Sequence, residues 1–168
     1  MNGFARTIQR TEELEDPLAR YVEMIVAAAA QMTDLLEGVS LLARIEGARY
    51  EPVLAETDTR ALADAAAEQR DGGVTVEGKG EAIETDAAGV TRSLAAFAWC
   101  AQRHGPAPAV TLRVQGREFV VMPITDAAAP VVTGEELKDL GAAVAMRTVR
   151  ALGGDVRLDG DQLTVRLA

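Results

Sequence analysis

The stretch LAAFAWCAQRHG, residues 94–105, contains the only cysteine and the only histidine of the chain, Cys100 and His104. Both residue types serve as nucleophiles or metal ligands, so these positions are the first candidates for chemistry. A lone cysteine cannot form an internal disulfide, and no second thiol is present to resolve an oxidised one. One cysteine with one histidine also falls short of a structural zinc set. The sequence therefore predicts no metal site and a packing role for Cys100.

Helix and strand patterns on both sides would position this stretch. Asp58 caps a helix predicted over about 59–69, GGVTVEG and EAIETD read as strands, and 94–105 is helical. AVTLRVQGREFVVMPI forms two strands joined by a Gln-Gly turn, and an Ala/Pro-rich loop, a helix over about 137–152 and the strand pair DVRLDGDQLTVRLA follow. Because this order lacks regular βαβ alternation, it predicts an α+β fold with helices on one face of a mostly antiparallel sheet.

The strongest periodic signal begins after Asp16, which can cap a helix that has Pro17 at its first position. Apolar residues then recur in alternating steps of four and three: Leu18, Val22, Ile25, Ala29, Met32, Leu36, Val39 and Ala43. A second line repeats every seven residues: Tyr21, Ala28, Leu35 and Leu42. This apolar face is wider than a two-stranded coiled coil needs, so we predict that a second copy of the chain covers it in a homodimeric bundle. Packing of the helix on its own C-terminal domain is the alternative.

Charge and hydropathy exclude several classes of partner. Seventeen basic residues against twenty-six acidic ones leave a net charge of −9, which repels nucleic acid and anionic membrane surfaces. No segment offers about 18 apolar residues in a row. The start MNGFARTIQR lacks the apolar core of a signal peptide. We therefore expect a cytoplasmic chain without membrane insertion.

Two motifs resemble the core of a sensor histidine kinase. Residues 41–52 read LLARIEGARYEP, similar to the phrase LLxLARIEAGRxEP that follows the dimerising hairpin in that family. Residues 94–104 read LAAFAWCAQRH, similar to the family's N box, LxNLLxNAxKH. The resemblance covers essentially the whole chain. It implies a dimerisation helical hairpin over 1–48 and, over 53–168, a two-layer α/β sandwich of the histidine kinase ATPase type.

The resemblance also shows which catalytic letters are lost from the N box. Ala96 and Cys100 stand at its two asparagine positions, and the second asparagine helps to hold a phosphate-bridging magnesium ion in the family. Neither a methyl group nor a thiol supplies the hard oxygen ligand that magnesium requires. His104 keeps the final histidine of the box, for which we favour a packing or surface role over that of a substitute phosphoacceptor. The family's phosphoacceptor phrase, HExRTPLNAIxGFA, is matched only at its tail by residues 1–5, so we expect the reactive histidine to be missing.

The later nucleotide motifs depart from the family in the same direction. In the DxGxG turn, Asp126 keeps the adenine-reading aspartate, whereas Ala128 and Pro130 replace the glycines. The long lid is reduced to about eight residues. In the GxGLxI motif, Gly141 keeps the second glycine and Asp139 replaces the first. That carboxylate lies where phosphates would meet a helix N-terminus, which disfavours ATP.

The resemblance implies a two-component signalling protein that is histidine kinase-like but catalytically inactive. It would act as a dimeric docking or regulatory module, without a cofactor, for a response-regulator receiver domain or a partner histidine kinase. The family's docking face maps onto four side chains: Arg6, Arg10, Arg20 and Tyr21. Three alternatives remain: a divergent ATP-binding kinase or phosphatase that uses Asp126, a histidine phosphotransferase-like enzyme whose histidine lies outside this chain, and an inert fragment or unrelated interaction protein.

Overall fold

The computed structural model describes residues 18–69, 73–106 and 109–168. The chain divides into two compact units, residues 1–40 and 41–168. The helix α2, Leu18–Glu46, supplies all the described structure of the first unit, and its last turns belong to the second. The predicted hairpin partner of this helix, like Arg6 and Arg10, lies outside the described residues.

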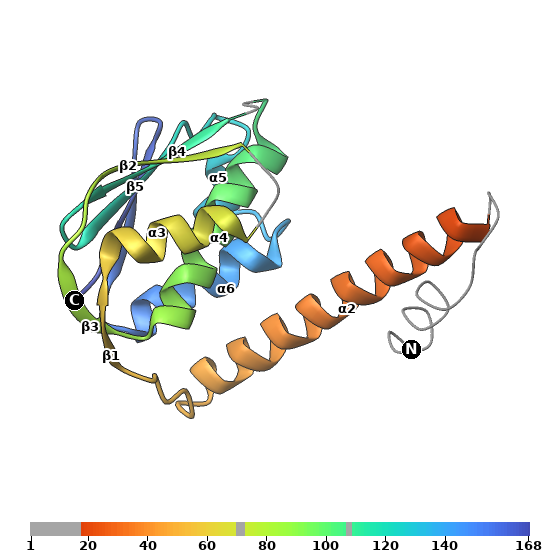
Figure 1. Ribbon diagram of the computed structural model, residues 1–168, viewed down its shortest axis with the longest axis horizontal. Helices are drawn as coiled ribbons and strands as arrows, with labels where there is room; N and C mark the ends of the chain where they lie inside the picture. The colour runs from red at the N-terminus through yellow and green to blue at the C-terminus, as the bar shows by residue number, and fades with distance from the viewer. Residues whose placement is uncertain (1–17, 70–72, 107–108) are drawn as a thin grey trace. The chain divides into compact units, whose positions relative to one another are not determined.

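The second unit contains strands and helices in a mixed order (Figure 1). Its elements are β1 (Ala55–Asp58), α3 (Thr59–Glu68), β2 (Val74–Lys79), β3 (Ala82–Thr85), α4 (Ala87–His104), β4 (Val110–Gln115), β5 (Glu118–Met122), α5 (Ala129–Val132), α6 (Leu140–Ala151), β6 (Asp155–Asp159) and β7 (Gln162–Arg166). Five strands form one sheet in the order β2-β4-β5-β7-β6, while β1 and β3 pair separately. Among the described strands, β2 and β4 are the only neighbours that run parallel.

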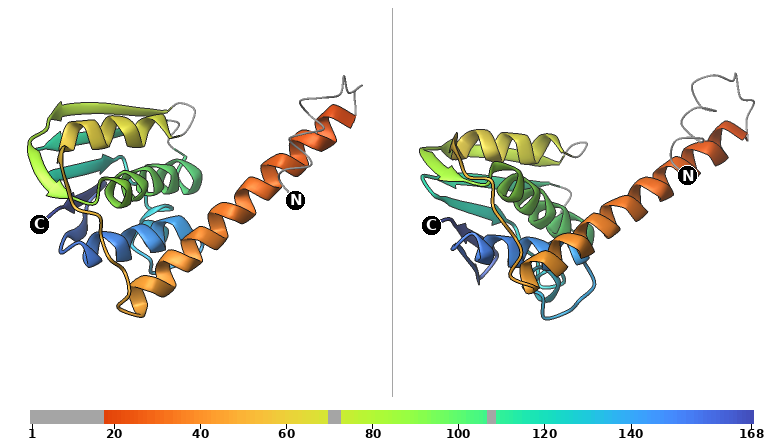
Figure 2. Two further views of the ribbon diagram at one scale, coloured as in Figure 1. Left: turned by 60° about the horizontal axis from the view of Figure 1, so that its bottom comes forward. Right: turned by 90° about the horizontal axis from the view of Figure 1, so that it is seen from below.

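Helices α3, α4 and α6 cover one face of the five-stranded sheet (Figure 2). The predicted α+β fold, a two-layer sandwich with a mostly antiparallel sheet, is confirmed. In β4 the residues that alternate along the strand toward the helices, Val110, Leu112 and Val114, are buried. Phe97 on α4 and Phe119 on β5 are the largest fully buried side chains. The rest of this core is built mainly from Ala, Val and Leu.

Turn and cap residues explain where the elements begin and end. Asp58 caps α3 through hydrogen bonds from the Arg60 and Ala61 amides, as its position before the helical pattern predicts. Gly78 has φ +90°, and a Cβ there would lie 2.0 Å from the Val114 carbonyl oxygen. No other residue type fits this close approach of β2 to β4.

Three local expectations need correction. The helix predicted from about residue 137 begins at Leu140, because the Asp139 side chain caps it by accepting the Ala142 amide hydrogen. The Ala/Pro-rich loop contains the short helix α5. The strand β1 was not predicted, because its four residues, AETD, lack apolar alternation and pair only with β3.

Candidate functional site

Five of the residues that the family motifs single out lie where α4 meets α6: Ala96, Cys100, His104, Asp139 and Gly141. The N-terminus of α6 packs directly on α4: a Cβ added at Gly141 would lie 3.6 Å from the Ala96 Cβ, an ordinary van der Waals contact. The two positions are 45 residues apart in the sequence, Gly141 minus Ala96. Gly141 therefore lies next to Ala96 where the start of α6 meets α4, at the end of the helix that an anion would approach.

Asp139 is built into the same junction. Its side chain is 7% exposed. Its Oδ1 accepts the Ala142 amide hydrogen at 3.0 Å, and its Oδ2 lies 3.4 Å from Nε2 of His104. The carboxylate thus occupies one of the amides that a helix N-terminus would offer to a phosphate, and it adds a negative charge there.

Cys100 lies on the buried face of α4 with no exposed surface. Burial, followed by the negative charge of Asp139, raises the pKa of its thiol to about 12, while Arg103 acts in the opposite direction. Because the thiolate is the nucleophilic form, a thiol with this pKa is unreactive at neutral pH. This environment supports a packing role over a redox or catalytic one.

The segment that corresponds to the adenine-binding turn leads directly into the short helix α5. Asp126 is exposed, and Ala128, fully buried, adopts a right-handed conformation as the residue before α5. The amides of Ala128 and Ala129 both donate to the Thr125 carbonyl oxygen at 2.9 Å. Backbone donors that a glycine-rich turn would leave free for a nucleotide are thus used inside the chain.

The segment between α5 and α6 is short and folds back on α5. The Glu136 amide donates to the Pro130 carbonyl oxygen at 2.7 Å, and Lys138 pairs with Glu136. Leu137, by contrast, is 84% exposed. With only residues 133–139 between the two helices, the segment matches the shortened lid that the motifs implied.

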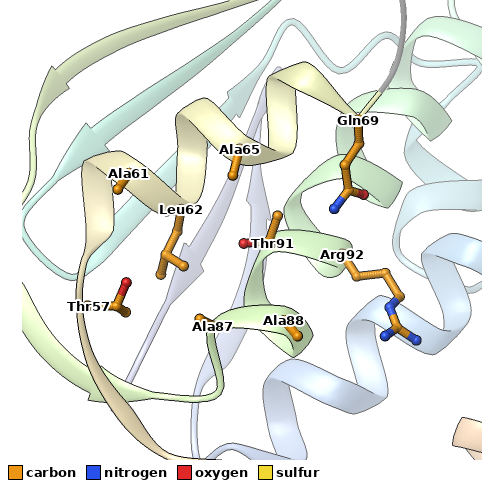
Figure 3. A pocket seen from close by; sticks show the side chains of 9 residues that line it. All are labelled: Thr57, Ala61, Leu62, Ala65, Gln69, Ala87, Ala88, Thr91 and Arg92. Carbon is orange, nitrogen blue, oxygen red and sulfur yellow. The ribbon is translucent and has the colours of Figure 1, made fainter.

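A surface pocket of about 420 Å³ lies elsewhere, between α3 and the first half of α4 (Figure 3). Thr57, Leu62 and Ala65 line it on one side, and Thr91 and Arg92 line it from α4. None of the predicted nucleotide residues contributes to this pocket. We therefore assign it no part in a nucleotide site.

Sequence reasoning missed a polar anchor that ties the segment after α2 to α4. The Tyr50 hydroxyl donates to Oδ2 of Asp86 at 2.8 Å, and the Val53 amide points to the same oxygen at 3.4 Å. Oδ1 of Asp86 caps α4 by accepting the Gly89 amide hydrogen at 2.9 Å. The capping role of Asp86 could have been predicted from the sequence, because this residue directly precedes the helical pattern. Its bond to Tyr50 requires the tertiary fold.

The anchor shifts the pKa of both partners. Burial, together with the hydrogen bond to Asp86 and its charge, raises the pKa of Tyr50 to about 12. Burial alone would raise the pKa of Asp86, but hydrogen bonds from Gly89, Tyr50 and Val53 outweigh it and hold this pKa below its ordinary value. The pair is therefore a neutral phenol and an ionised carboxylate across the neutral range.

The predicted dimer face of α2 is largely open. Five of its members are 52% to 71% exposed: Leu18, Ile25, Met32, Leu36 and Val39. Ala43 is also exposed, Ala29 is half-buried, and Val22 is buried at 7% exposure. Of the predicted docking residues within the described part of the chain, Arg20 and Tyr21 are both exposed. Exposed apolar surface of this extent is typical of a site that meets a protein partner or a membrane.

By length and composition, α2 is also the one helix among the described residues that could cross a membrane. Core helices of soluble proteins pass the same test. The sequence expectation of no membrane insertion depended in part on the lack of an unbroken apolar run, whereas α2 is apolar enough on average even with charged residues along its length. The membrane context of the chain is therefore open.

Neither a protein-family model nor a curated protein sequence matches the chain. Solved structures do match. The Acinetobacter baumannii histidine kinase AdeS is 15% identical with a TM-score of 0.67, over 99% of this chain and 91% of that one. Full-length ShkA, crystallised with AMPPNP, is 22% identical with a TM-score of 0.68, over 99% of this chain and 42% of that one. The ATP-binding domain of PrrB from Mycobacterium tuberculosis is 21% identical with a TM-score of 0.55, over 68% of this chain and 96% of that one.

These matches establish the fold. The chain has a long N-terminal helix followed by an α/β sandwich that matches the solved ATP-binding domains of histidine kinases, as the motifs at 41–52 and 94–104 implied. At these identities the likeness does not extend to activity, because one fold hosts many functions.

Proposed function

We propose that the chain is a dimeric, histidine kinase-like signalling module that docks a receiver domain or a partner kinase without nucleotide chemistry. The observation that carries the proposal is the buried Asp139 carboxylate, which caps α6 by accepting the Ala142 amide hydrogen and puts a negative charge where phosphates would meet this helix. The open apolar face of α2 supports dimerisation.

Charge within α2 supports a location outside the lipid core. The longest charge-free run in this helix is residues 24–33, between Glu23 and Asp34. A membrane-spanning helix needs about 20 apolar residues. Asp34 and Glu37 would lie near the centre of a spanning segment, where insertion experiments assign an acidic residue such as aspartate a cost of about 2.5–3.5 kcal/mol. We propose that this apolar face meets protein and that the chain is cytoplasmic.

His104, the only histidine in this sequence, is a poor candidate for accepting phosphate. Its Nε2 is buried and faces the carboxylate of Asp139 at 3.4 Å. A phosphoryl group there would meet like charge and would need the packed junction to open. This geometry favours the docking module over a phosphotransferase that acts through His104.

Thermal unfolding with magnesium ATP tests the proposal. A site with a dissociation constant of about 10 µM would stabilise the fold by about 2.7 kcal/mol in 1 mM ATP. For a chain of this size that raises the melting temperature by about 5–10 °C. We expect a shift below about 1 °C and no incorporation of labelled phosphate.

The variant Asp126→Asn is the control, because it removes the one adenine-reading group that the chain retains. A magnesium-dependent shift of several degrees that this variant abolishes would refute the proposal. It would assign the chain to the divergent ATP-using kinases or phosphatases instead.

A further inference from the structure

Three side chains with different ligand atoms meet where α4 and α6 join. Cys100 and His104 lie one turn apart on α4, so their side chains share a face of the helix. Asp139 approaches from the N-cap of α6. One sulfur, one imidazole nitrogen and one carboxylate oxygen from these residues all lie within 4.8 Å of one another.

The histidine in this cluster lacks a hydrogen-bond partner. Nε2 of His104 is buried and makes no hydrogen bond with any described residue. The nearest acceptor, Oδ2 of Asp139, lies 3.4 Å away, within range of an ion pair but without hydrogen-bond geometry. Buried polar atoms are almost always paired, so an unpaired imidazole nitrogen that faces a carboxylate and a thiol calls for a further ligand.

We propose that Cys100, His104 and Asp139 bind a zinc ion, with a water molecule or an external ligand in the fourth position. Zinc accepts sulfur, nitrogen and oxygen donors in one tetrahedral site. Magnesium and calcium require oxygen donors, so this set selects against them. The inference departs from the expectation that no metal binds, which counted cysteine and histidine only and could not place a carboxylate beside them.

The distances and charges suit such an ion. Tetrahedral zinc separates a nitrogen and an oxygen ligand by about 3.3 Å, and a sulfur from either of them by about 3.5 Å. The nitrogen and oxygen atoms are already 3.4 Å apart, whereas the sulfur must approach them by at most about 1.3 Å. Binding releases the Cys100 thiol proton to solvent, and the thiolate and carboxylate then balance the charge of the ion. A neutral complex avoids the cost of burying net charge.

Asp139 can cap α6 and bind the metal at the same time. Its Oδ1 caps α6 through the Ala142 amide, which leaves Oδ2 for the metal. The ion would then join the last turns of α4 to the first turn of α6, across the place that the motifs assign to a nucleotide. The proposal is independent of the docking function, because a zinc site would stabilise this junction whether or not a receiver domain binds.

Titration with zinc and with cobalt tests the site on the full chain, produced without a histidine tag and stripped with chelator. We expect one zinc ion per chain and, with cobalt, the near-ultraviolet band that reports a thiolate bound to the metal. Cys100→Ser should abolish that band. It should also weaken zinc binding by about 100-fold, because one of four ligands supplies about a quarter of the binding free energy of a structural zinc site. Asp139→Asn, which retains a capping side chain, should weaken binding without unfolding the helix.

Asp126→Asn is the matched control, since it removes an exposed carboxylate from a neighbouring loop and should leave zinc affinity unchanged. Circular dichroism checks that each variant folds; should Cys100→Ser fail, His104→Gln decides, because this side chain is 20% exposed and tolerates replacement. The proposal is overturned if the unmodified chain binds no zinc. It is equally overturned if binding survives the ligand variants at full strength, as it would for adventitious carboxylates.

Discussion

A charged residue on the apolar face of α2 should separate the proposed dimer. We expect the double variant Ile25→Glu, Leu36→Glu to be monomeric at concentrations at which the unmodified chain is a dimer. The two side chains are 54% and 71% exposed in one copy, so a partner copy has substantial apolar area to cover. Both belong to the line that recurs in steps of four and three.

The exposed fractions give the magnitude. Full burial of one large apolar side chain contributes about 1.5–3 kcal/mol. The five most exposed members of the seam are 52% to 71% exposed, so a partner would add about 1–2 kcal/mol for each, or about 10–20 kcal/mol over the ten in a dimer. Association costs about 4–15 kcal/mol. The double variant loses four of these side chains, about 4–8 kcal/mol, which weakens a dimer by about 1000-fold or more.

Light scattering coupled to size-exclusion chromatography measures the change, with sedimentation equilibrium to obtain the dissociation constants. Ala27→Glu is the control for each of the two single variants, because it adds the same charge. Ala27 is exposed and lies on the side of the helix opposite to the predicted dimer face. We expect it to leave the dimer intact. An unmodified chain that is monomeric at micromolar concentration would refute the bundle, and a double variant that stays dimeric would refute the assigned face.

Two further predictions concern docking and pH. Calorimetric titration with receiver domains should show binding that Arg20→Ala and Tyr21→Ala together weaken by at least about tenfold, about 1.4 kcal/mol; unchanged binding would refute the docking face. Because the pKa of Tyr50 is raised from 10.0 to about 12, the folded state holds this proton more tightly than the unfolded chain, so stability should fall as pH rises through that interval. The lowered pKa of Asp86 affects stability in acid. The stabilisation from its ionised carboxylate is lost as the pH falls below about 3.8. Urea unfolding across both ranges measures these effects, and Tyr50→Phe should flatten the alkaline one; an unchanged slope would show that the hydroxyl is not anchored to Asp86.

Local pattern was sufficient to predict most of the fold. The cap at Asp58, the alternation along β4 and β5 and the period of α2 each depend on neighbours within a few residues, so the sequence displays them directly. Where the local signal was weak, prediction failed: β1 is a short strand without alternation, and α5 is a single turn in an Ala/Pro-rich loop. The motifs around residues 41–52 and 94–104 supplied the architecture that pattern alone would have left open.

The candidate site required the tertiary structure. Asp139 lies beside His104, and Gly141 beside Ala96, because α6 packs on α4 although the 34 residues 105–138, which include β4, β5 and α5, separate His104 from Asp139 along the chain. From the sequence we could place a carboxylate at a helix N-terminus and a thiol on the buried face of another helix. The sequence does not show that these two groups are neighbours in space. Packing decides whether the Asp139 oxygen meets an amide, an imidazole or a solvent molecule. The same holds for Tyr50, whose hydroxyl reaches Asp86 only because the segment after α2 folds back onto the start of α4.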